Sequence, residues 1–269
     1  MMLTIRHTTT YRYAPRADRV GLRLKLFPAA TSSQMVSHWA VTVNDNAVSP
    51  LLTNPFGEAE ALWFTHAPVE EVTVVAEGSV SLSDTAGVLG KIGIARPGVF
   101  GRETDLTRPD DAIQALGEEM TGAGGLARMH CLNEAIHERV AYRKGTTDGK
   151  TTAAQALALG AGVCQDLTHV FIATARAMGL PARYVAGYLH DAEAPELATH
   201  AWAEVFLDAL GWTAFDPTHE TCPSERHVRL CSGADAADAA PIRGHVTGES
   251  EESLESDVII TQAQTQSQQ

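Results

Sequence analysis

The sequence contains no long apolar run. Hydrophobic residues make up 44% of the chain, an ordinary share for a globular protein, but no run approaches the roughly 20 apolar residues of a membrane-spanning helix. Residues 1–7 also lack the apolar region of a secretory signal peptide. We therefore expect a cytoplasmic protein that is not embedded in a membrane.

Basic residues and cysteines are both scarce. The chain has 20 Lys and Arg against 33 Asp and Glu, a net charge of −13. Nucleic-acid binding requires patches of Lys and Arg, so we expect no nucleic-acid partner. The cysteines lack the spacing of a disulfide framework, which favours a reducing compartment. They are Cys131, Cys164, Cys222 and Cys231.

Alternation with a period of two dominates residues 1–84. Residues 3–13 place Leu, Ile and Tyr on one parity and Arg on the other, and residues 20–26 alternate apolar and basic side chains. Strands with one apolar and one polar face are typical of an antiparallel β-sandwich, and we predict one here. No nucleophile and base suggest themselves in this part. Further strands are predicted at 35–43, 60–65 and 71–82.

The rest of the chain divides into three parts by composition. Residues 85–105 are rich in Gly and Pro and are interpreted as a linker. Residues 106–248 have helical periodicity first and short strand-like runs afterwards, an order that predicts an α+β core. Residues 249–269 are acidic and polar, so we predict only a last strand at 257–260 and disorder after it.

Cys164 follows a loop broken by glycines and opens an apolar helix that runs to Met178. The free N–H groups and the positive dipole at a helix N-terminus favour a thiolate. The N–H of Cys164 itself would be the first donor to an oxyanion, while the second donor cannot be placed from sequence. A free cysteine is commonly a small core residue, so its position is what favours a nucleophile.

His200 and Asp216 supply the other two groups of a Cys–His–Asp set. Their strand-like runs flank a turn at 208–211, and a hairpin would bring both residues near one end, although its register is not readable. His200 would then act as general base and Asp216 would fix its tautomer. The alternatives are a solvated edge histidine and an aspartate that merely begins a turn.

Other polar residues compete for roles at this site. Asp166 is interpreted as an acid that complements the helix N-terminus, because its charge would oppose a thiolate. His169 is poorly placed on the helix face, and His190 has no matching acid. A rival zinc site would use four residues whose spacing matches no standard pattern. They are His219, Cys222, His227 and Cys231.

Several stretches together carry a family resemblance: residues 3–13, 162–166, 179–188, 200–205 and 211–218. On these motifs the chain resembles the bacterial transglutaminase-like family, whose core is shared with papain-type cysteine peptidases. The resemblance spans residues 1 to about 248. It implies a β-rich N-terminal domain and a core whose nucleophile lies at a helix N-terminus packed on an antiparallel sheet. It also implies Cys164 as nucleophile, His200 as base and Asp216 as the group that orients it.

Two runs depart from the family pattern. Residues 54–58, Asn-Pro-Phe-Gly-Glu, stand where relatives tend to carry Asp and Gly-Asn. Residues 232–236, Ser-Gly-Ala-Asp-Ala, stand where they tend to carry a Gly-Arg-Asp-Tyr-like run, and we expect this second difference to reshape the substrate cleft. No acidic loop suggests calcium, and we expect neither a cofactor nor a metal.

These observations predict a thiol-dependent acyl-transfer enzyme that acts on a protein or peptide substrate through a thioester. We favour a cysteine peptidase or amidase, because crosslinking inside a cytoplasm is hazardous. The alternatives are a transglutaminase that joins Gln to an amine and a non-catalytic binding module with a vestigial triad. Neither the natural substrate nor the oligomeric state follows from the sequence.

Overall fold

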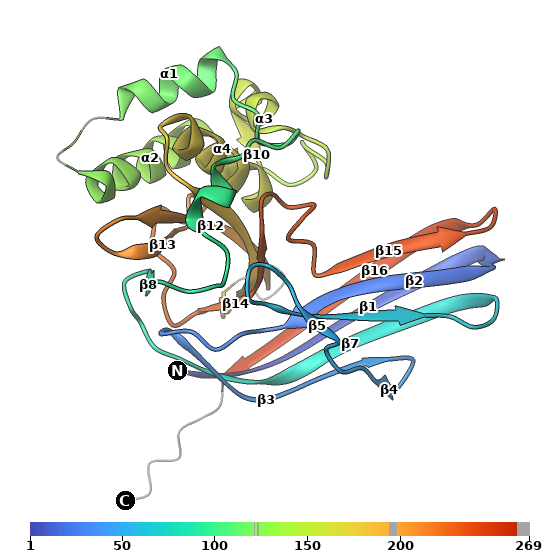
Figure 1. Ribbon diagram of the computed structural model, residues 1–269. Coiled ribbons are helices and arrows are strands. Elements are labelled where there is room, and N and C mark those ends of the chain that lie inside the picture. The colour runs from blue at the N-terminus through green and yellow to red at the C-terminus, as the bar shows by residue number, and fades with distance from the viewer. Residues whose placement is uncertain (121, 123, 194–197, 263–269) are drawn as a thin grey trace, which may run out of the picture.

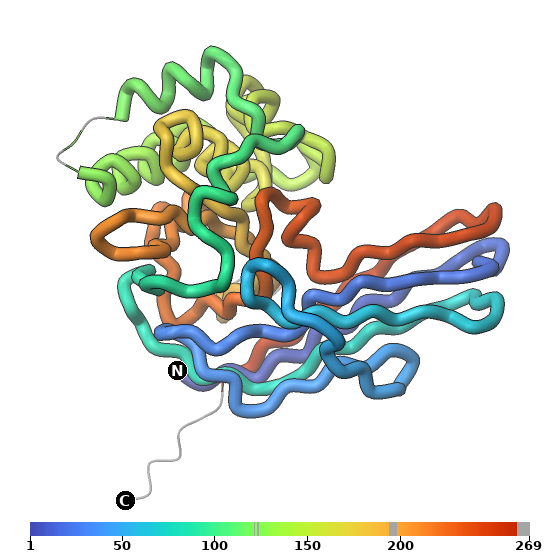
Figure 2. Tube along the Cα trace, in the orientation of Figure 1, coloured from blue at the N-terminus to red at the C-terminus, as the bar shows by residue number. Residues whose placement is uncertain are grey.

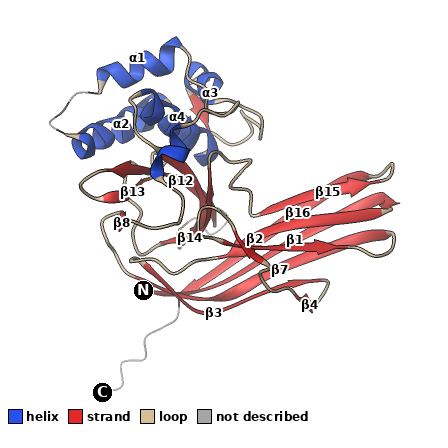
Figure 3. Cartoon of the chain, in the orientation of Figure 1, coloured by secondary structure: helices blue, strands red, loops and turns tan. Residues whose placement is uncertain are grey.

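The structure, a computed structural model, describes residues 1–120, 122, 124–193 and 198–262. Its helices lie together at one end, and long strands extend away from them (Figure 1). Colouring by secondary structure separates these two regions clearly (Figure 3). The molecule is rich in antiparallel β-sheet, as predicted for residues 1–84, and its later part mixes helices with strands.

Two antiparallel sheets form around the N-terminal strands. One has the order β16-β1-β7-β3-β4 and the other β15-β2-β6-β5. Alternate residues of β1, β2 and β7 are buried, and side chains from both sheets join one hydrophobic cluster. The strands are β1 (Met2–Ala17), β2 (Arg19–Phe27), β3 (Gln34–Val43), β4 (Asn46–Ala47), β5 (Leu52–Thr53), β6 (Ala59–Phe64), β7 (Val69–Leu82), β15 (Ile242–Thr247) and β16 (Glu251–Gln262).

The C-terminal part of the chain differs from the prediction. Instead of a short strand at 257–260, β16 extends over Glu251–Gln262 and pairs antiparallel with β1 from Ala14 to Leu3. β15 pairs with β2 in the other sheet, so the red and blue tubes lie side by side (Figure 2). Most of β16 is exposed, which explains why its sequence is acidic and lacks an apolar face. Residues 263–269 lie outside the described residues.

A second sheet region carries the helices. Its order is β14-β11-β12-β13-β8, and α4 packs on β11 and β12 while contacting the other three helices. Residues 166–176 of α4 are buried on every side. The helices are α1 (Asp111–Glu119), α2 (Gly125–Arg139), α3 (Ala153–Leu159) and α4 (Cys164–Ala177); the strands are β8 (Val88–Gly90), β11 (Ala182–Leu189), β12 (Thr199–Leu207), β13 (Gly211–Phe215) and β14 (His227–Gly233).

The stretch predicted as a linker takes part in this second region. β8 pairs with β13, and the short helix η1 (Pro97–Gly101) buries Phe100 against Trp212. The Gly- and Pro-rich stretch 85–105 is therefore a connection that packs on the edge of this sheet. None of the described helices is long and apolar enough to cross a membrane.

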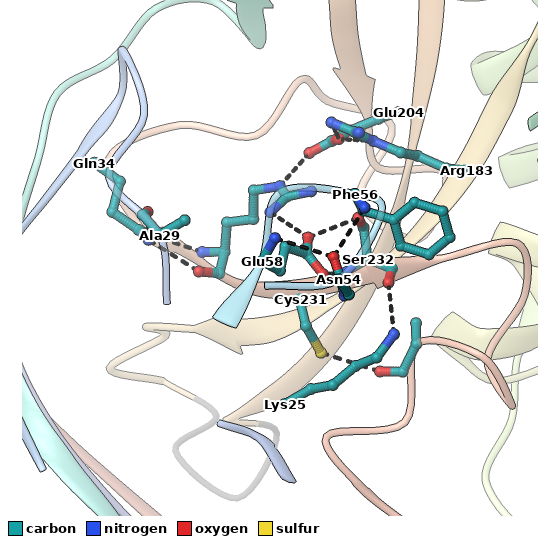
Figure 4. Close-up of polar contacts among 12 residues, drawn as sticks. Lys25, Ala29, Gln34, Asn54, Phe56, Glu58, Arg183, Glu204, Cys231 and Ser232 are labelled. Atoms are coloured by element: carbon teal, nitrogen blue, oxygen red, sulfur yellow. Dashed lines mark hydrogen bonds and ion pairs between the residues drawn. The ribbon is translucent and has the colours of Figure 1, made fainter. Parts of the chain in front are cut away.

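A buried network of charges joins the two regions (Figure 4). Arg229 on β14 donates to Glu58 (2.9 Å) and to Glu204 on β12 (2.8 Å). Glu204 also accepts from Arg183 (2.6 Å), and Glu58 accepts from the hydroxyl of Ser232 (2.7 Å). All five side chains are buried. The run 54–58 and the run 232–236, which both depart from the family pattern, thus meet in this network.

Removing the central cation should destabilise the protein strongly. Arg229→Met leaves Glu58 and Glu204 buried without their shared partner, and we expect a loss of about 3–5 kcal/mol of unfolding free energy, measured by urea denaturation. Arg12→Met is the matched control, because Arg12 pairs with Glu71 and Glu255 at the exposed surface and should matter far less. Equal losses in the two variants would contradict the role given to burial.

Candidate active site

The loop before α4 is fixed by the first turn of that helix. Asp166 accepts hydrogen bonds from the backbone N–H of Val163 (2.8 Å) and from the hydroxyl of Thr147 (2.7 Å). A Cβ on Gly162 would lie 2.6–2.9 Å from the Asp166 side chain, so only glycine fits there. Cys164 follows as the first residue of α4. Asp166 therefore has the structural position expected for it.

His200 and Asp216 meet because their strands form the expected hairpin. β12 and β13 pair with Ala203 opposite Phe215, which leaves Asp216 just beyond the end of β13 and His200 near the start of β12. Nε2 of His200 lies 2.7 Å from Oδ2 of Asp216, and both side chains are buried. The sequence identified this end of the hairpin correctly, and the structure supplies the register.

Electrostatics favour a protonated His200 beside an ionised Asp216. Burial alone would lower the pKa of His200, but the charge of Asp216 and hydrogen bonds to Asp216 and Cys164 raise it to about 10. Burial alone would raise the pKa of Asp216, but His200 and two further histidines hold it well below its usual value. Because Nε2 of His200 faces Asp216, Nδ1 is the nitrogen left for Cys164.

Two histidines that the sequence did not assign to this site also contact Asp216. Nδ1 of His219 lies 2.9 Å and Nε2 of His227 lies 3.2 Å from the same oxygen, Oδ2. The backbone N–H of Ser224 donates to Nδ1 of His227 (3.1 Å), so neutral His227 carries its proton on Nε2 and donates to Asp216. His219 lies three residues after Asp216, whereas the contact of His227 depends on the path of β14.

The rival zinc site is not assembled. Cys231 is buried and its Sγ lies 3.1 Å from the carbonyl oxygen of Ala239, while His219 and His227 are directed at Asp216. Among the described residues, one group of three donor atoms lies close enough for a metal ion: those of His200, Asp216 and His219. Their contacts of 2.7 and 2.9 Å are hydrogen bonds, which a metal would have to replace.

The competing bases lie elsewhere. Burial lowers the pKa of His169 to about 4, and its Nε2 accepts the backbone N–H of Ala236 (3.1 Å). Through this hydrogen bond the run 232–236 packs against the buried side of α4. Residues of that run do not line the cavity beside Cys164, so the expected reshaping of the cleft is not seen there. His190 borders a different cavity.

Cys164 and His200 line a common cavity of about 380 Å³. Most of its other lining residues are apolar or aromatic. Three strands of the N-terminal sheets also line it: β1 with His7, Thr9 and Tyr11, β15 with Ile242, and β16 with Leu254 and Ser256. Nδ1 of His7 lies 3.0 Å from the Tyr188 hydroxyl. These wall residues were not found from the sequence, because β1 shows only the alternation of an ordinary strand.

Comparisons with known proteins cover both regions of the chain. The sequence model of the transglutaminase-like superfamily matches residues 114–217, which include Cys164, His200 and Asp216. The model of the bacterial transglutaminase-like N-terminal region matches residues 3–81. An uncharacterized protein of Mycobacterium leprae is 27% identical, over 95% of this chain and 96% of its own length. Another, from Mycobacterium tuberculosis, is 36% identical over 46% of this chain and 43% of its own.

A solved structure with the same fold comes from Cytophaga hutchinsonii, where the protein is named as a candidate cysteine protease. It covers 98% of this chain and 92% of its own, with a TM-score of 0.76 and 20% sequence identity. At that identity the likeness concerns the fold.

The raised pKa of His200 predicts a specific pH dependence of stability. Protonated His200 contributes fully to the unfolding free energy below the free imidazole pKa of about 6.5. This contribution is lost as the pH rises through about 10, the pKa of His200 in the folded protein. The difference in unfolding free energy between wild type and His200→Gln should therefore shrink over that interval, by at most about 5 kcal/mol. Urea denaturation at several pH values measures it. A difference that stays constant between these values would contradict the raised pKa.

Proposed function

Because the chain belongs to the transglutaminase-like superfamily, we propose that it is a thiol-dependent acyl-transfer enzyme that acts on peptide or side-chain amides. The observation that carries the proposal is the shared cavity: Cys164 opens α4 beside His200, and His200 is held by Asp216. A nucleophile and a base in one cavity, with a buried acid that orients the base, are the parts that acyl transfer requires.

In the proposed reaction, the thiolate of Cys164 attacks the amide carbon and forms a tetrahedral intermediate. The backbone N–H of Cys164, in the first turn of α4, donates to the oxyanion. Protonated His200 gives its proton to the leaving nitrogen, so ammonia or an amine departs and a thioester remains. A water molecule then loses its proton to His200 and attacks the thioester, which releases a carboxylic acid and restores the Cys164 thiolate beside protonated His200.

We further propose hydrolysis as the outcome, which makes the protein a cysteine peptidase or amidase of the cytoplasm. The four cysteines are all free, as a reducing compartment requires. An amine in place of water would produce a transglutaminase through the same thioester, and a vestigial triad would leave only binding. The measurements below distinguish hydrolysis from both alternatives.

Alkylation tests the thiolate–imidazolium pair directly. At about pH 6, iodoacetamide should modify Cys164 at least about tenfold faster than Cys131, an exposed cysteine that serves as the internal control. His200→Ala should remove this excess, because the imidazolium no longer stabilises the thiolate. Peptide mass spectrometry follows each cysteine separately. Equal rates at the two cysteines in wild type would remove the main support for the enzyme.

Product analysis tests the fate of the thioester. With glutamine-containing peptides and casein as donors, we expect release of ammonia or new amino termini, lost by roughly a thousandfold or more in Cys164→Ala. Incorporation of a labelled primary amine in preference to water would identify a transglutaminase. If Cys164 is reactive but no donor is turned over, hydrolysis of these amides is wrong.

A further inference from the structure

We propose that the substrate is an extended polypeptide that binds as an added strand along the free edge of β16. This inference rests on the proposed function and names the class of substrate and the surface that recognises it. Addition of a strand satisfies the main-chain donors and acceptors of the ligand, whatever its side chains. The site would therefore select chain conformation first and side chains second.

One edge of β16 pairs with no strand in the part of the chain that the structure describes. It is the outermost strand of its sheet, and β1 occupies only one of its two sides. No strand among the described residues pairs with the other side. Its 12 residues are almost all exposed. An edge of this length presents a row of unpaired N–H and C=O groups, which is a template for another chain.

The free edge faces a cavity. A second cavity, of about 570 Å³, is lined by five consecutive residues of β16, from Ser256 to Ile260. Successive side chains of a strand point to opposite faces, so these five residues belong to both faces of β16. A cavity that borders residues of both faces and lies opposite the ends of β11 and β12 fits a position against the strand edge. Its described opposite wall consists of Leu189–Ala192 and Ala198–Thr199, at the ends of β11 and β12.

This edge cavity continues into the cavity beside Cys164. Thr199 and Ser256 line both, and Thr199 directly precedes His200. Five residues of an extended chain span about 16 Å, so a peptide lying along Ser256–Ile260 would reach the nucleophile with its next residues. The apolar walls beside Cys164 would then receive a single side chain of that peptide.

The charges along β16 agree with this role. All four acidic residues of β16 lie within its first seven positions, at Glu251, Glu252, Glu255 and Asp257, whereas Val258–Gln262 carry no charge. Charged side chains usually protect a strand edge against pairing with another chain. Of the residues Ser256–Ile260 that line the edge cavity, only Asp257 is charged. Ile259 is 53% exposed there. Asp191 and Asp257 at this cavity disfavour acidic side chains in the ligand.

Proline substitutions test the two edges of β16 one at a time. Neighbouring residues direct their N–H groups to opposite edges, so one of Val258→Pro and Ile259→Pro removes a free N–H and the other removes a bond to β1. The variant that keeps its unfolding free energy is the informative one. Ala47→Pro on β4, the opposite edge of the same sheet, is the matched control.

The probe is a fluorescein-labelled peptide of about ten alternating Val and Thr residues with Lys at both ends and a central Gln, long enough to span both cavities. Its affinity for Cys164→Ala protein is measured by fluorescence anisotropy, so binding is read without turnover. We expect the informative proline to weaken binding about tenfold or more and Ala47→Pro to leave it unchanged. N-methylation of alternate amides of the peptide should cause the same loss, and this arm needs no further variant.

The outcomes distinguish this inference from the proposed function. No binding of the peptide, or equal binding of its N-methylated form, would overturn strand addition even if Cys164 proves reactive. Binding that depends on the β16 edge, found together with an inert Cys164, would support strand addition and refute the enzyme.

Discussion

One buried oxygen, Oδ2 of Asp216, connects the elements of the candidate site. His200 comes from β12, His219 from the turn after β13 and His227 from β14, and all three reach this atom. An isolated buried carboxylate is costly, so its ionised form depends on these donors and on the N–H of Thr218 (3.0 Å). The strands must therefore keep one register, because a slip of one residue would direct His200 to the other face.

The same need for satisfied charges joins the core to the N-terminal sheets. Glu58 and Arg229 come from the two regions and are buried against each other. Their separation would leave the Glu58 charge without its partners on β14 and Arg229 with Glu204 alone, so the two regions hold a fixed relation. That relation matters for the site, because β1 and β16 contribute walls to the cavity that Cys164 and His200 share.

The sequence predicted those features that are set locally. Residue parity identified β1 and β2, and the turn at 208–211 placed His200 and Asp216 at one end of a hairpin. It identified only residues 257–260 of β16, because a strand exposed on both faces has no apolar period and the Glu residues of its first half resemble a disordered tail. It considered His219 and His227 only as ligands of a rival zinc site, since their shared partner becomes visible only when β14 is folded beside β11. Such contacts depend on the pairing of strands that are distant in sequence, and this pairing cannot be predicted from the spacing of residues along the chain.

The pairing of β1 with β16 joins residue 3 to residue 262 and so affects the order of events during synthesis. β1 therefore emerges from the ribosome well before β16, the neighbour with which it pairs. Until then the wall formed by Leu254 and Ser256 is absent, even though Cys164 and His200 have already been translated. The cavity that Cys164 and His200 share is therefore completed only after β16 has been made and has paired with β1.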